Sequence, residues 1–122
     1  MSYKLIWEPK GVTKLFFDHV TSDDLVQSVK SVHGDSRFDS LRFVINDFLA
    51  CKGLSVTEEA VDEISAVDGA AARSNPHIAI AVVATAPEIV DLASQYAQSP
   101  MNAYPTRIFP TQVEGRAWLG LD

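Results

Sequence analysis

Apolar and polar positions along this chain alternate in segments that predict strands and helices in turn. Two segments are continuously apolar or nearly so, residues 41–45 (Leu-Arg-Phe-Val-Ile) and residues 77–84 (His-Ile-Ala-Ile-Ala-Val-Val-Ala). β-Branched runs without regular polar alternation are typical of strands that are covered on both faces, as in a parallel sheet. We therefore predict that these two runs are the central strands of the fold.

Shorter strands are expected near both ends of the chain. Residues 3–7 and 12–19 favour strands, and the turn residues at 9–11 (Pro-Lys-Gly) separate them. A connection this short suits only antiparallel neighbours, so the pair predicts an N-terminal β-hairpin. Residues 106–109 predict a last short strand.

Four helices are predicted, and each follows a hydroxyl residue that has an acidic residue three positions later. This spacing is typical of an N-terminal capping box. The four hydroxyl residues are Thr21, Ser55, Thr85 and Thr111. Apolar residues recur at helical spacing after each of them, and Gly34 is expected to end the first helix.

The alternation of strands and helices predicts a single α/β domain over residues 1–122. Successive strands joined through helices must be parallel, with right-handed crossovers. The expected order is ββαβαβαβα, with about five mostly parallel strands, an N-terminal hairpin and four helices.

Composition and charge narrow the class of protein. The net charge of −6 and the pI near 4.9 argue against a nucleic-acid partner, because phosphate binding needs clustered Lys and Arg. A single cysteine excludes an internal disulfide and fits a reducing cytoplasm. The longest apolar stretch, residues 78–86, is far shorter than the roughly 20 residues of a membrane span, so we expect a cytoplasmic protein without a transmembrane segment.

The first place to look for a site is the carboxyl edge of the sheet, where strands give way to helices. Residues 48–54 are predicted to be a loop there, and its apolar Phe48 and Leu49 are expected to line a pocket mouth with Ala84, Ala86, Met101 and Tyr104. The alternative is that a neighbouring helix simply covers them. Residues predicted for a ligand or partner site are Asp47, Phe48, Leu49, Cys51, Ser55, Thr85, Ala86 and Tyr104.

Motifs for catalysis are weak. Asp18, His19 and Asp47 could converge at the same edge as an acid/base or metal site of a small hydrolase, but exposed loop residues explain the same pattern. Cys51 has no base near it in sequence, which a nucleophile would need. The chain contains no Gly-x-Gly-x-x-Gly, P-loop or Gly-x-Ser-x-Gly motif. We therefore expect a protein that is not an enzyme, with no metal and no cofactor.

Several segments resemble the SpoIIAA-like proteins, which share the fold of STAS domains and are related to CRAL-TRIO lipid-binding domains. They are the N-terminal hairpin, residues 41–48 (Leu-Arg-Phe-Val-Ile-Asn-Asp-Phe), residues 77–83 (His-Ile-Ala-Ile-Ala-Val-Val) and residues 107–119 (Arg-Ile-Phe-Pro-Thr-Gln-Val-Glu-Gly-Arg-Ala-Trp-Leu). The resemblance covers nearly the whole chain. It implies a β-α superhelix and a small bacterial cytoplasmic protein, with either a regulatory protein-protein role or a pocket for an apolar or amphipathic molecule.

The resemblance also suggests a phosphorylation site. Anti-sigma-factor antagonists of the STAS group carry a phosphorylated serine just after the central strand, in an Asp-Ser-Ser-Gly setting. That motif is absent here, and Ser55 and Thr57 stand only roughly at the place of the acceptor. A phosphate at a helix N-terminus would be favoured by the dipole and free amides, whereas the alternative is that Ser55 is only an N-cap.

Two hypotheses follow from the sequence. The leading one is a non-enzymatic SpoIIAA-like domain that binds a small apolar or amphipathic ligand, or a partner protein, at the carboxyl edge of the sheet. The alternative is a regulatory module of the anti-sigma-factor-antagonist type, switched by phosphorylation at Ser55 or Thr57 or by formation of a homodimer.

Overall fold

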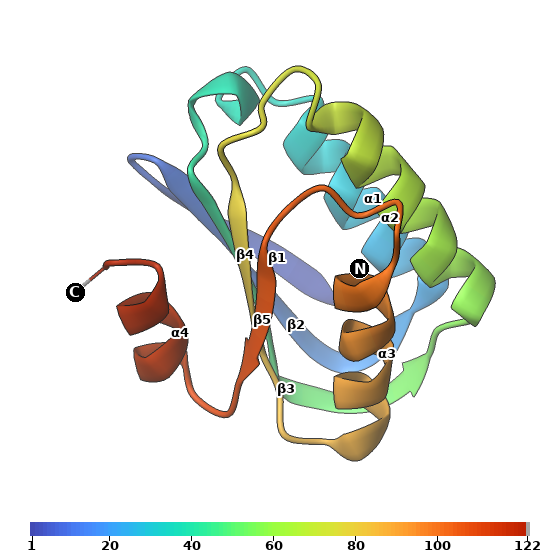
Figure 1. Ribbon diagram of the computed structural model, residues 1–122. Helices are drawn as coiled ribbons and strands as arrows, with labels where there is room; N and C mark the ends of the chain where they lie inside the picture. The colour runs from blue at the N-terminus through green and yellow to red at the C-terminus, as the bar shows by residue number, and fades with distance from the viewer. Residues whose placement is uncertain (122) are drawn as a thin grey trace.

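The computed structural model describes residues 1–121 and contains a five-stranded sheet with helices on both faces (Figure 1). The strands are β1 (Tyr3–Glu8), β2 (Gly11–Thr21), β3 (Phe43–Ser55), β4 (Ala79–Val83) and β5 (Thr106–Phe109). They lie side by side in chain order, with β1 antiparallel to β2 and every other neighbouring pair parallel. The predicted α/β fold with an N-terminal hairpin is confirmed.

Three α-helices and one short 3-10 helix lie in the connections between strands, and a fourth α-helix follows β5. They are α1 (Ser22–His33), η1 (Phe38–Ser40), α2 (Glu58–Ala71), α3 (Pro87–Gln98) and α4 (Gln112–Trp118). Helices α1, α2 and α3 cover one face of the sheet, and α4 lies on the other (Figure 1). The three crossovers share one hand and the strands are added in one direction, so their helices must lie on the same face. None of the helices among residues 1–121 has the length and apolar character needed to cross a membrane.

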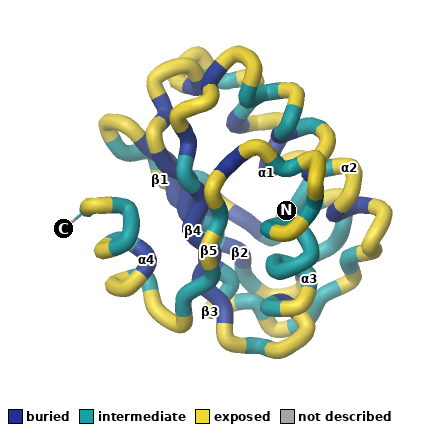
Figure 2. The backbone as a smooth tube through the Cα atoms, viewed as in Figure 1, coloured by how far each residue is buried: buried dark blue, intermediate teal, exposed yellow. Residues whose placement is uncertain are grey.

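Much of the central sheet is buried (Figure 2), and its side chains alternate between two layers, one on each face. The larger layer lies beneath α1, α2 and α3 and includes Val12, Val44, Ile80, Val82 and Ile89. The smaller layer lies beneath α4 and consists of Phe43, Ile45, Ala81 and Val83. Trp118 packs α4 onto the sheet, with its ring centroid 5.7 Å from that of Phe109.

The segment 48–54 is strand, so the loop predicted there is wrong. β3 is 13 residues long because the neighbouring β2 has 11 residues and pairs with it as far as Thr21 and Ser55. Register shifts occur in β2, and Asp18 near one of them has a positive φ of 54°. Gly53 favours a loop in the local sequence, but hydrogen bonds with β2 keep this segment in the sheet.

Both central strands begin two residues later than predicted, and β4 also ends one residue earlier than predicted. Leu41 is the C-cap of η1, with its N–H donated to the Phe38 carbonyl, so β3 begins only at Phe43. The run predicted at 77–84 forms β4 over Ala79–Val83. Strand β5 occupies residues 106–109 as predicted.

Two predicted helix caps are confirmed. The Thr21 hydroxyl accepts from the Asp24 N–H, and the Asp24 carboxylate accepts from the Thr21 N–H, which completes a capping box at α1. The Thr111 hydroxyl accepts from the Glu114 N–H at α4. Gly34 is the C-cap of α1, also as predicted.

The other two predicted caps are wrong. Ser55 still belongs to the ladder between β2 and β3, so α2 begins later and Thr57 is its N-cap. Helix α3 has Ala86 as its N-cap, which has no hydroxyl to offer, and Thr85 lies one residue too early. Pro87 occupies the first helical position. Proline has no N–H that would need a cap, and its fixed φ already suits a helix.

Candidate functional site

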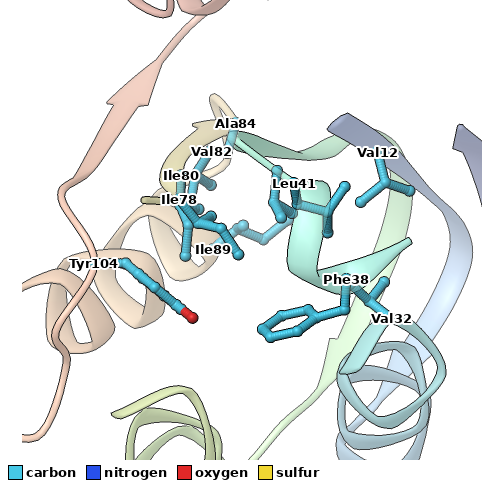
Figure 3. Close-up of a cluster of buried hydrophobic side chains, with 11 residues drawn as sticks. Val12, Val32, Phe38, Leu41, Ile78, Ile80, Val82, Ala84, Ile89 and Tyr104 are labelled. Atoms are coloured by element: carbon cyan, nitrogen blue, oxygen red, sulfur yellow. The ribbon is translucent and has the colours of Figure 1, made fainter. Parts of the chain in front are cut away.

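A cavity of about 110 Å³ lies between the sheet and helices α1, α2 and α3. Its walls are mainly apolar side chains from the sheet and from the three helices that cover it, among them Val29, Val44, Val61, Ile80, Val82 and Leu92. At one end the rings of Phe38 and Tyr104 extend toward each other from opposite sides (Figure 3). Since an apolar cavity of about 150 Å³ is known to take up benzene, this space is on the scale of a small organic molecule.

Lys14 is a charged residue in this apolar wall. It lies in the middle of β2, it is only 5% exposed, and its Nζ donates one hydrogen bond, to Ser28 Oγ at 3.2 Å. Burial lowers the pKa of Lys14 to about 8, although the Asp68 carboxylate acts in the opposite direction. The fold therefore holds an ammonium group at a place where its charge is unfavourable.

Asn46 lies beside Lys14, because the two residues are paired in register on β3 and β2. Its Oδ1 is buried without a hydrogen-bond partner in the part of the chain that the structure describes, and its side chain lines the cavity. Buried polar atoms without partners are rare in native proteins, and each calls for an explanation. Lys14 and Asn46 together form a polar spot on the sheet side of the cavity.

Asp68 joins the three helices at the opposite wall. Its carboxylate accepts from His33 Nε2 of α1 at 2.9 Å and from the Tyr96 hydroxyl of α3. Burial and the nearby Asp68 charge raise the pKa of Tyr96 well above its ordinary range. The same two causes raise the pKa of Tyr104 to about 12, and the Tyr104 hydroxyl donates to the Asn75 carbonyl at 2.9 Å.

Two of the predicted site residues line the cavity, Phe48 and Tyr104. Phe48 stacks on Phe16 of β2, with ring centroids 4.5 Å apart and the rings nearly parallel. Its covered position agrees with both sequence alternatives, since helices lie over it and a cavity lies next to it. The site is therefore under the crossover helices, inside the domain, and not at an open loop.

Asp47 and Leu49 face away from the cavity, because side chains alternate along β3. The Asp47 carboxylate accepts from Gln112 Nε2 of α4 at 2.7 Å and from the Leu49 N–H at 2.9 Å. Leu49 is 51% exposed. Extension of β3 through this segment thus separates Phe48 from the two residues that flank it.

The remaining predicted residues do not line the cavity either. Ser55 is exposed, and its Oγ lies 2.7 Å from His19 Nε2. Cys51 is half-buried and donates to the Gly53 carbonyl, and burial raises the pKa of its thiol, which makes it a poor nucleophile. The others are Thr85 and Met101, which are exposed, and Ala84 and Ala86, which pack on the larger buried layer.

The acid/base cluster considered from the sequence does not form. Asp18 pairs in register with Cys51, whereas Asp47 pairs with Leu15, so the two carboxylates lie at different levels of the sheet. Asp18 instead lies 4.0 Å from Lys52 Nζ at the surface. Among residues 1–121, the His, Cys, Asp and Glu side chains form no group of three that could hold a metal ion.

Sequence reasoning missed Lys14, Asn46 and Asp68. The signal was present in the periodicity, because Lys14 and Asn46 each have apolar residues two positions before and after them. Asp68 lies seven positions after Val61, on the inner face of α2. A polar residue at an inward position is the feature that marks a buried site.

Comparison with known structures agrees with this architecture. The anti-sigma factor antagonist SpoIIAA in its unphosphorylated form superposes with a TM-score of 0.63 and 8% sequence identity, over 97% of each chain. An uncharacterised protein of the DUF3478 family from Shewanella loihica PV-4, described as having a SpoIIAA-like fold, gives a TM-score of 0.58 and 12% identity, over 96% of this chain and 91% of that one. No protein-family model and no curated protein sequence matches the chain. The chain has the SpoIIAA-like fold.

Proposed function

We propose that this SpoIIAA-like domain is a non-enzymatic binding module that holds a small, mainly apolar molecule between the sheet and helices α1, α2 and α3. The observation that carries the proposal is the cavity of about 110 Å³ in the middle of the core. Protein interiors are close-packed, and voids much larger than a water molecule are few. Left empty, a void of this size would cost about 2–3 kcal/mol at about 24 cal/mol per Å³. A bound molecule removes that cost.

The arrangement of the walls supports binding over catalysis. Apolar side chains from three strands and three helices surround the space, and its few polar groups converge from different elements, as in ligand pockets generally. The residues considered for a hydrolase lie on separate levels of the sheet and outside this space.

Toluene and pentan-1-ol are suitable first probes, because both are small and neutral. We expect each to raise the denaturation temperature of the protein and to shift the NMR signals of methyl groups such as those of Val29 and Val82. At a ligand concentration of 100 times Kd, the stabilisation should reach about 2.7 kcal/mol.

The specific variant is Ala93→Leu, which adds three carbon atoms to the wall of the cavity on α3. It should abolish binding of both probes while the domain stays folded. Ala66→Leu, the same change at an exposed position of α2, is the matched control and should bind as the wild type does. Unchanged methyl signals in the wild type at saturating probe concentrations would refute the proposal.

A second candidate is a regulatory module switched by phosphorylation, as proposed from the sequence. Exposed hydroxyls at the start of α2 favour it, since Ser55 and Thr57 are both exposed and Thr57 caps a 14-residue helix. A phosphate there would meet the positive end of the helix dipole. Glu58 and Glu59 in the first turn oppose it by charge repulsion.

Mass spectrometry of the protein isolated from its native host tests this candidate. It predicts a phosphorylated peptide spanning residues 53–60, which is lost in the double variant Ser55→Ala, Thr57→Ala. Complete coverage of that peptide without any phosphate, under several growth conditions, would remove the candidate and leave ligand binding untouched.

A further inference from the structure

We infer that the molecule held in the cavity carries a carboxylate, which accepts hydrogen bonds from the ammonium of Lys14 and the side-chain amide of Asn46. The inference rests on the proposed function and specifies its ligand as a small organic acid with an apolar body. Neither the fold nor the comparisons assign a ligand to this space.

Lys14 carries a buried charge that is not balanced by a nearby ion pair among the described residues. An ammonium has three donors, and here one of them reaches a neutral hydroxyl, Ser28 Oγ. Ser28 is itself committed, because its hydroxyl donates to the Leu25 carbonyl at 2.8 Å. Buried charges are normally paired, and Lys14 is 95% buried with no carboxylate of residues 1–121 within ion-pair distance.

Asp68 does not supply that pairing. Its two oxygens accept from His33 Nε2 and from the Tyr96 hydroxyl, and neither lies within ion-pair distance of the Lys14 ammonium. Its charge reaches Lys14 only through space, as an influence on the Lys14 pKa. An anion on the cavity side of Lys14 would complete the neutralisation that Asp68 leaves partial.

The side-chain amide of Asn46 supplies a second polar group at the same place in the cavity wall. Asn46 is paired in register with Lys14, and neighbouring strands lie about 4.8 Å apart, so the two polar ends face the cavity side by side. The Asn46 amide makes no side-chain hydrogen bond to the described residues, and its Oδ1 is buried without a partner. Since rotation by 180° exchanges Oδ1 and Nδ2, this amide can present a donor to a carboxylate next to Lys14.

The size of the cavity limits the rest of the molecule. A carboxylate occupies the polar spot, and the remaining volume is bounded by Val, Leu and Ile side chains. A chain or ring of about four to six carbons matches a space slightly smaller than one that holds benzene. Pentanoate is therefore the probe, and pentanamide, which has the same shape without the charge, is its neutral counterpart.

The test is isothermal titration of both probes into the wild type, Lys14→Met, Asn46→Leu and the control Lys4→Met, which changes an exposed lysine of β1. At pH 7 pentanoate should bind the wild type at least tenfold more tightly than pentanamide does. The preference should disappear in Lys14→Met, fall severalfold in Asn46→Leu and persist in Lys4→Met. Folding of each variant is checked by circular dichroism.

The pH dependence provides a second readout. The titratable groups around Lys14 in the cavity are His33 from α1, Asp68 from α2, Tyr96 from α3 and Tyr104 from the segment before β5. The two tyrosines stay neutral up to pH 10, because their pKa values are raised. Pentanoate affinity should therefore be constant near pH 7 and fall up to tenfold per pH unit above the Lys14 pKa of about 8. Pentanamide affinity should not fall in this way.

The outcomes separate the two proposals. If toluene binds but pentanoate binds no better than pentanamide, the carboxylate inference is wrong and the proposed function stands. If the pentanoate preference survives in Lys14→Met, the inference is also wrong. If none of the probes binds the wild type, both proposals fail.

Discussion

Replacement of Lys14 by methionine should make the protein more stable. Methionine has nearly the same length and no charge, so Lys14→Met removes the buried ammonium and keeps most of the packing. Replacing buried charges by apolar side chains of similar volume has been stabilising by 1–4 kcal/mol in other proteins. Removal of the charged group is therefore the perturbation that most directly tests how this cavity is built.

The expected size of this stabilisation follows from the lowered pKa of Lys14. A change in the pKa of Lys14 from its ordinary 10.5 to about 8 corresponds to about 3 kcal/mol, at 1.36 kcal/mol for each pH unit. Loss of the hydrogen bond to Ser28 subtracts about 1 kcal/mol. We therefore expect Lys14→Met to raise the free energy of unfolding by about 2 kcal/mol at pH 7, a large fraction of the 5–15 kcal/mol typical of a domain.

The stability gained through Lys14→Met should decrease as the pH rises. Because folding lowers the pKa of Lys14, the unfolded chain binds more protons than the folded one between about pH 8 and 10.5. The penalty in the wild type is complete below pH 8 and disappears as the pH rises toward 10.5. The difference in stability between Lys14→Met and the wild type should thus shrink by about 3 kcal/mol from pH 7 to pH 10.5.

Urea denaturation of the ligand-free protein, followed by circular dichroism at pH 7, 8, 9 and 10, measures this difference. Lys4→Met makes the same chemical change at an exposed position and should alter stability by less than about 0.5 kcal/mol at every pH. A Lys14→Met protein that is less stable than the wild type at pH 7, or a gain that does not change with pH, would refute the reasoning.

Three further predictions concern the remainder of the fold. Glu8→Gln should destabilise the protein by about 1 kcal/mol at neutral pH, because Arg116 of α4 makes two hydrogen bonds to the Glu8 carboxylate. These bonds lower the pKa of Glu8, so the stability difference should vanish as the pH falls below the ordinary 4.5 and through the lowered value, as followed by urea titration. Asn75→Ala should cost about 2–3 kcal/mol in the same assay, since the buried Asn75 amide donates to two backbone carbonyls. Cys51 should react with a thiol reagent at pH 8 more slowly than free cysteine, because burial raises its pKa; an equal rate would contradict its placement.

The sequence by itself determined the elements that depend on local pattern. Continuous apolar runs placed β4 and the start of β3 within two residues, and the turn at 9–11 specified the hairpin. The caps Thr21 and Thr111 were predictable because a hydroxyl and an acidic residue three positions apart complete their hydrogen bonds within one helical turn. From these elements followed the alternation of strands and helices along the chain and the mostly parallel sheet.

Only the tertiary structure decided the length of β3 and the composition of the cavity. Residues 48–54 are strand because β2 pairs with them, and such pairing joins residues more than 30 positions apart in the chain. Because of this pairing, Phe48 points toward the cavity and Asp47 points away from it. The N-cap of α2 is therefore Thr57 and not Ser55. A local pattern does not encode hydrogen bonds made by another strand.

The polar spot in the cavity has the same origin. Lys14, Asn46 and Asp68 come from β2, β3 and α2, and each taken alone resembles an ordinary polar interruption of an apolar face. Parallel register places Lys14 and Asn46 side by side, and helix packing brings Asp68 over them. The chemistry of a buried charge depends on what surrounds it in space, so it is decided only when these separate elements pack together.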